Sequence, residues 1–552
     1  MNKRSMVVIA SLFVLSSAVL LNFQAEAAKN NQQLRNLVQG LPYEWSDDPE
    51  PQYADAEYKL TDGEHGSEQF WDSAWVGHLR GKTREVTFDL GEKKSIERIQ
   101  ANFLQDAASG IQFPNTVSIY VSNNKRTWGT LAHINTKIGI WTSGPPVTQP
   151  FVWDGKEDRF WKGNPNAEMA YARYVKVTFT AEVWTFIDEI EIWGYDGKMN
   201  GAVPVPADPP KYMQAGEATG GINHLVLLYN GHYDSGVGHW TKADMLPYVS
   251  WVDENGRPQD WLFDGVLLLG LLTPGYRSFE TGTATLEDWK WYLNKTFGPE
   301  GELDQLNEAV KEAKEALNDP NYKEKVVIMI PNPGNELSDF GDVDGDGISE
   351  NFNDSLIGAE AAYENKRKAI HWWMDQVNER WEEGNYEHLQ FTGMYWLSEG
   401  VGLSNPLEPQ LIQKTSRLVH DNDLKFFWIP YFQGNRNYDW KSLGFDAAVL
   451  QPNHFFSSAS NPDRIQDAAQ LAQTYHMGVE IEFDERINAD PEKRGRYIDY
   501  LNGGVDYGYM KDAFKAYYQG NKALLESALS SDPTVREHYD WMYQFIKGTY
   551  KK

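Results

Sequence analysis

The chain has 552 residues, 41% of them hydrophobic and 24% charged, which is enough for two or three globular domains. Its formal net charge of −28 disfavours nucleic acid and anionic bilayers as partners and leaves neutral or cationic ones. The absence of cysteine excludes disulfides, thiolate nucleophiles and thiolate metal sites.

Residues 1–27 have the pattern of a secretory signal peptide. Lys3 and Arg4 are basic, residues 6–23 are mostly apolar, and "AEA" at 25–27 is a typical cleavage site. We therefore expect a secreted protein, with association to the cell wall left open and a retained membrane anchor as the alternative. No later segment has the roughly 18 consecutive apolar residues of a transmembrane helix.

Residues 40–197 predict an all-β domain of the sandwich or jelly-roll type. Short runs alternate apolar and polar residues and are separated by turn residues. The runs are REVTFDLG, SIERIQANFL, TVSIYVSN, RYVKVTFTA and IDEIEIWG. Residues 198–219 follow as a linker, because the stretch from 197 to 216 contains four prolines together with glycines and alanines.

These runs, together with "KLTDGEHGSEQFWDSAWVG", resemble the discoidin-like family of coagulation-factor C-domain type, to which sugar-binding modules of many secreted glycosidases belong. The resemblance implies a β-sandwich with a structural calcium ion. It places Asp62, Glu64 and Ser67 in the calcium loop, although Glu64 stands where the family usually has asparagine, and Glu189 as the closing carboxylate. An ordinary Asp-Gly turn is the alternative. The candidate exposed rings for a ligand face are Trp75, His78 and Trp141.

Residues 220–548 change to apolar runs that alternate with helical stretches. The runs begin at residues 224, 263, 325, 391, 425, 446 and 478, and a weaker eighth covers 503–510; clear helices are predicted at 303–317 and 361–381. About eight such alternations are typical of a TIM-like (β/α)8 barrel. An open doubly wound sheet is the alternative, but no glycine-rich phosphate fingerprint follows the first strand.

Two of the predicted strands deliver carboxylates at their C-terminal ends, where barrel enzymes have their active sites. Glu399 follows the fourth strand. Glu480 and Glu482 lie two residues apart in the seventh, so both face the same side of the strand. The apolar residues that alternate with them would face the helices, which places both carboxylates in the barrel interior. Because an inward carboxylate is costly to bury, Glu399 and Glu482 are the candidate catalytic pair. The alternative is an interior salt bridge with Arg436 or Arg486.

Other polar and aromatic residues near the strand ends are candidates for holding a sugar. Aromatic residues make up 14% of the chain, a share typical of sugar-binding proteins or of an aromatic-rich core. The candidate substrate-binding residues are Glu480, Tyr431, Asn453, His454, Trp396, Tyr229 and His232.

The carboxylate pair resembles that of the large clan of retaining β/α-barrel glycosidases, which places the acid/base after strand 4 and the nucleophile after strand 7. That clan usually has asparagine before the acid/base, where this chain has Ser398. The runs FDGVLLLG, GDVDGDG, FFWIPYFQG, LQPNHFF and AYYQG also resemble a family of secreted bacterial domains of unknown function, number 4855. That second resemblance implies location and architecture but no reaction.

A separate acidic motif, "DVDGDGISENFN" at 342–353, has the spacing of an EF-hand-type calcium loop. Asp342, Asp344 and Asp346 match its first three ligand positions, but Asn353 stands where a bidentate carboxylate belongs. A calcium loop and a solvated acidic turn are both compatible with this pattern.

The sequence predicts a secreted glycoside hydrolase that acts on an extracellular or cell-surface polysaccharide, with no cofactor for catalysis. A non-catalytic glycan-binding adhesin with a degenerate barrel is the first alternative. A metal-dependent deacetylase is a further one, for which His232, Asp234 and His239 form the local group of possible ligands.

Overall fold

The computed structural model describes residues 33–140, 142–157, 166–403 and 405–552. The predicted signal peptide and Trp141 lie outside these ranges. The chain divides into two compact units, Met1–Pro209 and Pro210–Lys552, and this division falls inside the predicted linker. Each unit contains its own large hydrophobic core.

The first unit is built from antiparallel strands, as its alternating sequence predicts. Its central strand is β4, which bends at a register shift between Asp89 and Lys94 and pairs with β2, β7, β8 and β9. The strands are β1 (Arg35–Asn36), β2 (Tyr43–Trp45), β3 (Val76–Leu79), β4 (Arg84–Gln105), β5 (Thr116–Ser122), β6 (Gly129–Asn135), β7 (Val147–Asp154), β8 (Met169–Phe179), β9 (Trp184–Tyr195) and β10 (Ala202–Val203). Short 3₁₀ turns are η1 (Pro51–Tyr53), η2 (Lys59–Thr61) and η3 (Ala107–Ser109).

Parts of the predicted linker belong to the two units themselves. Strand β10 pairs with β8 of the first unit. In the second unit, Tyr212 is buried and donates its hydroxyl hydrogen to the carbonyl of Tyr507 at 2.9 Å. The turn η4 (Glu217–Thr219) then leads into the first barrel strand.

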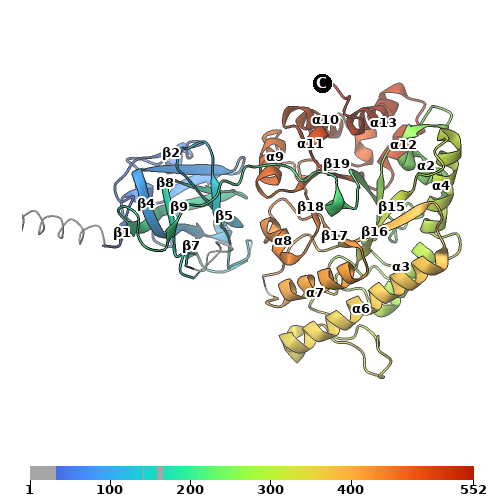
Figure 1. The fold of residues 1–552 in the computed structure, drawn as a ribbon, viewed down its shortest axis with the longest axis horizontal. Coiled ribbons are helices and arrows are strands. Elements are labelled where there is room, and N and C mark those ends of the chain that lie inside the picture. Colours follow the sequence, from blue (N-terminus) through green and yellow to red (C-terminus); the bar gives the residue numbers. More distant parts are fainter. Residues whose placement is uncertain (1–32, 141, 158–165, 404) are drawn as a thin grey trace, which may run out of the picture. The chain divides into compact units, whose positions relative to one another are not determined.

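The second unit is a closed barrel of parallel strands with its helices on the outside, so the (β/α)8 prediction is confirmed (Figure 1). In order around the barrel the strands are β11 (His224–Tyr229), β14 (Gly265–Leu269), β15 (Glu324–Ile330), β16 (Leu389–Trp396), β17 (Lys425–Trp428), β18 (Ala447–Leu450), β19 (Gly478–Glu482) and β20 (Lys515–Tyr518). A hairpin of β12 (Ser250–Val252) and β13 (Pro258–Trp261) is added after the first strand.

The helices connect successive strands, which is why the sequence alternates as it does. They are α2 (Lys242–Val249), α3 (Leu286–Phe297), α4 (Glu302–Leu317), α5 (Asp354–Ile357), α6 (Ala359–Gly384), α7 (Glu408–Asp421), α8 (Trp440–Leu443), α9 (Asp463–Thr474), α10 (Pro491–Asp506), α11 (Tyr509–Asp512), α12 (Ala523–Ala528) and α13 (Pro533–Ile546); short turns are η5 (Asn437–Asp439) and η6 (Glu485–Asn488). Within the described part of the chain, no helix is long and apolar enough to span a bilayer.

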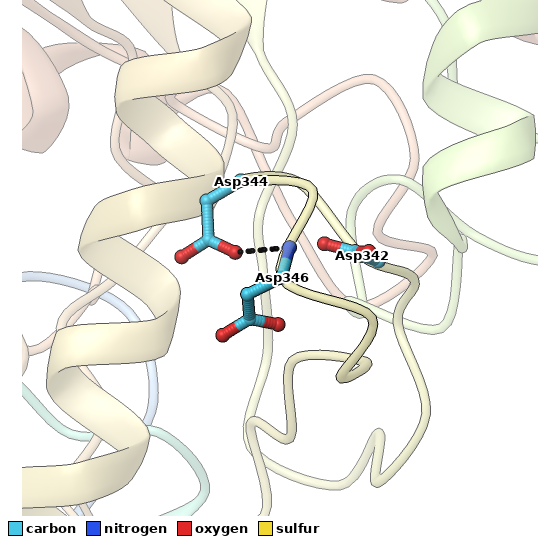
Figure 2. Close-up of side chains that lie close together, drawn as sticks. All are labelled: Asp342, Asp344 and Asp346. Atoms are coloured by element: carbon cyan, nitrogen blue, oxygen red, sulfur yellow. Dashed lines mark hydrogen bonds between the residues drawn. The ribbon is translucent and has the colours of Figure 1, made fainter.

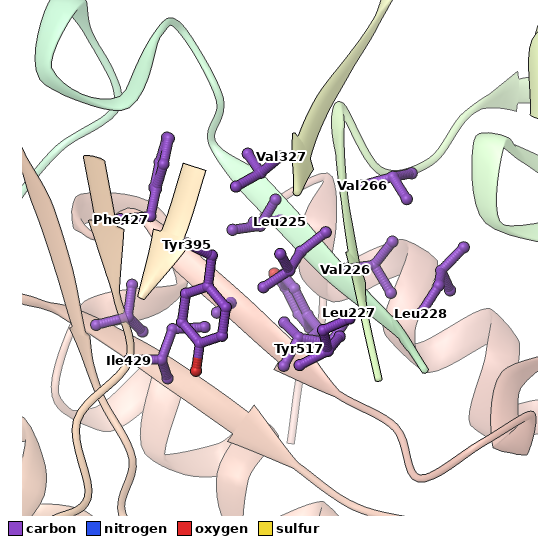
Figure 3. Close-up of a cluster of buried hydrophobic side chains, with 14 of the residues drawn as sticks. Leu225, Val226, Leu227, Leu228, Val266, Val327, Tyr395, Phe427, Ile429 and Tyr517 are labelled. Carbon is purple, nitrogen blue, oxygen red and sulfur yellow. The ribbon is translucent and has the colours of Figure 1, made fainter. Parts of the chain in front are cut away.

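The barrel strands read as continuous apolar runs because both of their faces are buried. Figure 3 shows part of this core around β11 and β16. Alternate residues of β11 point into the barrel, and Leu227 and Tyr229 among them line its central cavity.

The prediction of the eighth strand at 503–510 is wrong. That segment forms the end of α10 and the start of α11, while the eighth strand is β20, with the sequence KAYY. Gly503 and Gly504 serve close helix packing: a Cβ on Gly503 would lie 2.3 Å from Ile465, and one on Gly504 would lie 2.4 Å from Phe545. A strand of four residues is too short to show a periodicity in the sequence.

Candidate functional site

A cavity of about 290 Å³ opens at the C-terminal ends of the barrel strands. Glu399, Glu480 and Glu482 all line it, so residues from the fourth and seventh strands are brought together. The rest of the lining consists of Leu227, Tyr229, Tyr395, Ile429, Tyr431, Gln451, Asn453, Phe456 and Tyr518. No lysine or arginine is among these described lining residues.

Glu482 is held by two hydrogen-bond donors on one oxygen. The backbone N–H of Asn453 donates to its Oε2 at 2.6 Å, and the Tyr500 hydroxyl donates to the same oxygen. Asn453 has a φ of 51°, a left-handed conformation that asparagine tolerates better than most residues, and its side-chain amide donates to the Tyr431 hydroxyl at 3.1 Å. Burial raises the pKa of Glu482 to about 7, while the bonds from Tyr500 and Asn453 oppose the shift. The two donors therefore favour the ionised form of Glu482 within a buried setting.

Glu480 lies deeper in the barrel and is 2% exposed. Burial raises its pKa well above the usual range, and the charges of Glu482 and Glu399 add to the shift. Of two coupled carboxyls, the one without compensating donors takes the proton, so Glu480 is the neutral member of the pair. Neither arginine of the predicted salt-bridge alternative pairs with it: Arg436 pairs with Asp439, and Arg486 with Asp484.

Glu399 has a different environment. Burial raises its pKa, the Gln451 amide opposes the shift, and the Glu280 carboxylate adds to it. Burial also raises the pKa of Glu280, which lies in the loop after β14. Burial and the Glu280 charge thus favour the protonated form of Glu399, which is the form that a general acid needs.

Three of the predicted substrate-binding residues do not line this cavity. His454 is 1% exposed and its ring contacts Ser460 at 2.8 Å and Asp499 at 3.0 Å. Its backbone N–H donates to the Tyr500 hydroxyl at 3.0 Å, so it supports Glu482 indirectly. Trp396 faces the other side of β16, and His232 contacts Asp234 at 3.3 Å in the loop after β11.

Sequence reasoning missed Tyr500, Tyr518 and Glu280. Tyr518 ends β20, the strand that the pattern misplaced. Tyr500 lies inside an ordinary helical pattern, and Glu280 in a loop whose path no spacing reveals.

The group His232, Asp234 and His239 does not converge. His239 lies 3.6 Å from Glu302, whereas Asp234 accepts a hydrogen bond from the Tyr276 hydroxyl at 2.6 Å. Within the described residues, the one cluster with the spacing of metal ligands is Asp342, Asp344 and Asp346. The deacetylase alternative therefore has no ligand set at the barrel mouth.

Figure 2 shows that acidic cluster at the turn of an exposed loop. One oxygen of each aspartate lies within 4.8 Å of the others, a separation that one cation could bridge. Asp342 accepts from the amides of Gly345 and Gly347, and Lys368 donates to Asp344 at 2.6 Å. A calcium ion here would compete with the lysine.

The same acidic loop offers no carboxylate at its last ligand position. The side chain of Asn353 accepts from the Leu356 amide at 3.2 Å and so caps α5. The remaining acid of the loop, Glu350, accepts from the Val343 amide at 3.0 Å. The loop therefore presents three aspartates instead of a complete EF-hand ligand set.

In the first unit, the loop after η2 meets the end of the sandwich near Glu189. The Gly63 amide donates to Glu189 Oε2 at 3.3 Å, while Oε1 is buried with no hydrogen-bond partner in the described structure. Burial raises the pKa of Glu189 to about 8, and the Asp62 charge adds to the shift. An orphaned carboxylate oxygen beside a second carboxylate fits a cation ligand, so Asp62 and Glu189 suit the calcium implied by the resemblance.

The other residues predicted for that loop are placed differently. Glu64 is exposed, and the Ser67 amide donates to Asp72 at 3.1 Å. Trp75 and His78 are each 1% exposed, so the prediction that they are exposed rings is wrong. The indole N–H of Trp75 donates to the Ser67 carbonyl at 2.9 Å and pins the loop to the sandwich.

A family model described as "Domain of unknown function (DUF4855)" matches residues 224–544. The chain belongs to the DUF4855 family. A model of the F5/8 type C domain matches residues 45–192, so the discoidin-like identification of the first unit is also confirmed. The glutamates of the central cavity all lie inside the DUF4855 region.

Several solved structures are similar to this DUF4855 protein. Chitosan-binding module 1 of a chitosanase/glucanase from Paenibacillus sp. IK-5 is 17% identical, with a TM-score of 0.19 over 29% of this chain and 99% of that one. A fucose-binding module of Streptococcus pneumoniae is 12% identical, with a TM-score of 0.21 and coverages of 29% and 99%. A GH29 fucosidase of Ruminococcus gnavus is 18% identical, with a TM-score of 0.20 and coverages of 31% and 28%. A search of curated proteins gave no match.

Proposed function

We propose that this protein is a glycoside hydrolase. Its barrel would cleave a glycosidic bond of a bound glycan that lies between the carboxyl groups of Glu399 and Glu482. The observation that carries the proposal is the cavity that the two carboxyls share, in which Glu482 is fixed by two hydrogen-bond donors. Glu399 would protonate the leaving oxygen. Glu482 would act on the opposite side of the sugar, as nucleophile or as base for water.

The lining of the cavity supports a neutral or amino-sugar substrate. Its charged side chains are all carboxyls, which would repel an anionic sugar ring and attract an ammonium group. The hydroxyls of Tyr229, Tyr395 and Tyr431 supply hydrogen bonds for sugar hydroxyls. Phe456 is 39% exposed at the rim and offers a ring face for stacking.

The first unit is proposed as the glycan-binding module, which its F5/8 type C match supports. Trp71 is 67% exposed and lies in the loop that Trp75 pins, so it replaces Trp75 as the candidate stacking ring. We also propose calcium at Asp62 and Glu189, and a second cation at Asp342, Asp344 and Asp346. Secretion after cleavage at residue 27 completes the proposal and predicts a mature chain that begins at Ala28.

Hydrolysis of amino-sugar and neutral polysaccharides by the purified chain tests the catalytic assignment. Glu399→Gln and Glu482→Gln should each lower kcat by about 10²- to 10⁴-fold while the far-ultraviolet spectrum stays unchanged. The matched control is Glu492→Gln, which removes an exposed carboxylate that pairs with Arg496 on α10 and should leave kcat unchanged.

Unchanged turnover in either active-site variant would remove the pair from the mechanism. Binding of a glycan without cleavage of any substrate by the unmodified chain would favour the adhesin alternative instead.

A further inference from the structure

A second cavity, of about 420 Å³, lies on the other side of β16 from the central one. Tyr395 lines the central cavity and Trp396 the second, as expected for consecutive strand residues on opposite faces. The two cavities are neighbours at the barrel mouth, because Glu399 lines one while Ser398 and Gly400 line the other.

The second cavity contains two buried donor groups with incomplete partners: a lysine without a counter-charge and an indole N–H without an acceptor in the described structure. Lys366 of α6 is 2% exposed, and its ammonium group donates to Asn335 Oδ1, an atom that also accepts from the Asn405 amide at 3.2 Å. No carboxylate of the described residues forms an ion pair with Lys366. Trp396 is 1% exposed, and its indole N–H has no acceptor in the described part of the chain.

Burying an ammonium group without a counter-charge is unfavourable, and so is burying an N–H group without an acceptor. Burial lowers the pKa of Lys366, while the negative charges of Asp354 and Glu408 oppose the shift. An unsatisfied buried donor in a native structure requires an explanation, and a bound anion that supplies the acceptor is one. A group that satisfies a cation and a neutral N–H at once is a carboxylate.

Glu336 and Glu408 are the acidic side chains that line this cavity, and within the described residues neither forms an ion pair with Lys366. Of the two, Glu408 is the one whose charge acts on the pKa of Lys366. Its Oε2 accepts from the Gly402 amide at 2.9 Å, so that oxygen is already used. Burial raises its pKa to about 7, while the charge of Lys366 opposes the shift. Because Lys366 donates to Asn335 and forms no ion pair with Glu408 in the described structure, its ammonium group can still bind a further anion.

We propose that the second cavity binds the carboxylate of an acidic sugar residue, through Lys366 and Trp396. The inference rests on the proposed function, because it treats the cavity as a subsite for a glycan whose neighbouring unit occupies the central cavity. Asn332, Asn335 and Ser398 line the same space and present the amide and hydroxyl groups that suit the remaining sugar hydroxyls.

Calorimetric titration of the full chain with sodium glucuronate tests this binding. Glucuronate should bind, whereas glucose, which lacks the carboxylate, should bind at least about tenfold more weakly, since a hydrogen bond to a charged group is lost. Lys366→Met and Trp396→Phe should each weaken glucuronate binding by roughly ten- to hundredfold. The matched control is Lys368→Met, two residues along α6, which changes a lysine that contacts Asp344 outside the cavity.

The outcomes distinguish a sugar acid from a small organic acid as the ligand. They also distinguish a failure of this binding site from a failure of the proposed hydrolase function. Equal affinity for acetate and glucuronate would overturn the sugar subsite in favour of a site for small organic acids. Equal affinity of glucuronate for the unmodified chain and both cavity variants, each folded by circular dichroism, would overturn the site itself. Because titration needs no turnover, glucuronate should still bind to Glu399→Gln, whether or not the barrel proves to be a hydrolase.

Where hydrolysis is found, kinetics provide a second readout. On a glycan that carries carboxylated sugars, Lys366→Met should raise KM by about tenfold or more and leave kcat within about twofold. On a neutral glycan the same variant should raise KM by a much smaller factor, because no hydrogen bond to a carboxylate is lost. An equal change on both glycans would indicate a structural role for Lys366 and contradict the subsite.

Discussion

Glu482 combines near-complete burial with two hydrogen-bond donors, and this combination makes the stability of the barrel depend on pH. Its pKa is about 7 in the folded chain, against 4.5 for an unperturbed glutamate. A group with a raised folded pKa contributes stability that is fully present below the unfolded value and is lost as pH rises through the folded one. The loss attributable to Glu482 should therefore develop between about pH 4.5 and 7.

Glu482→Gln should remove that loss, because the amide oxygen can still accept from Tyr500 and Asn453 and carries no charge. We expect the variant to unfold at a higher temperature than the unmodified chain at pH 8, with a gain of roughly 1–3 kcal/mol, and at nearly the same temperature at pH 4.5. Thermal unfolding across this range checks it, with Glu492→Gln as the control. The stability difference between the variant and the unmodified chain is compared at the two pH values. If the variant were stabilised less at pH 8 than at pH 4.5, the assigned pKa would be contradicted.

Glu189 supports a second prediction at the scale of single residues. Calcium should raise the unfolding temperature of the first unit, since binding to the folded state alone stabilises it by about 2.7 kcal/mol at a hundredfold excess over Kd. Glu189→Gln should abolish this increment, because the orphaned Oε1 is replaced by a weaker ligand or by an amide nitrogen. Glu191→Gln, two residues along the same strand, should keep it. If calcium raised the unfolding temperature equally in both variants, Glu189 would be excluded as a calcium ligand.

Gly282 and Gly334 make a close contact between two of the loops that carry the sites. Both have positive φ, of 74° and 66°, and a Cβ on Gly282 would lie 2.3 Å from the Cα of Gly334. This contact joins the loop after β14, which holds Glu280, to the loop after β15, which holds Asn335.

Gly282→Ala should therefore destabilise the fold and disturb the second cavity. We expect a loss of roughly 2–4 kcal/mol, the sum of the left-handed conformation and the clash. The control is Gly236→Ala, with a φ of 77° and open space at its Cβ, which should lose only about 1 kcal/mol. Chemical denaturation measures both. Equal losses in the free energy of unfolding for Gly282→Ala and Gly236→Ala would show that the contact between the two loops contributes nothing to stability.

The elements that the sequence predicts well are those with long or regular patterns. The helices at 303–317 and 361–381 appear as α4 and α6, because each presents an apolar face at helical spacing over four or more turns. Seven barrel strands were also placed correctly, since buried apolar runs punctuated by polar strand ends are distinctive. The eighth failed because β20 has four residues and is preceded by glycines that pack helices.

The same reasoning explains which site residues were found. Glu480 and Glu482 could be predicted because a period of two fixes which side of the strand they face. His454 and Trp396 were placed at the barrel mouth from strand-end position alone, and position does not tell whether a ring points into the cavity or into the packing behind it. Glu280 and Lys366 reach the sites from a loop and a helix, and only the tertiary structure brings them there.

At the scale of the whole molecule, the two units have separate cores: one is formed by residues between Leu37 and Val205, the other by residues between Tyr212 and Tyr550. Each unit should therefore fold by itself and carry its own activity. For the proposed function, this separates attachment to a glycan from its cleavage.

A chain that begins at Pro210 should accordingly hydrolyse a soluble substrate with unchanged kcat/KM, and should lose most of its retention on the insoluble form of the same glycan. In the full chain, Trp71→Ala should reproduce the loss of retention alone, because stacking on one exposed ring contributes about 1 kcal/mol or more to binding a sugar face. Sedimentation with the insoluble glycan and turnover of the soluble one measure the two properties. A shortened chain that folds but loses turnover of the soluble substrate would show that cleavage requires the first unit, and retention unaffected by Trp71→Ala would move the binding face elsewhere on the sandwich.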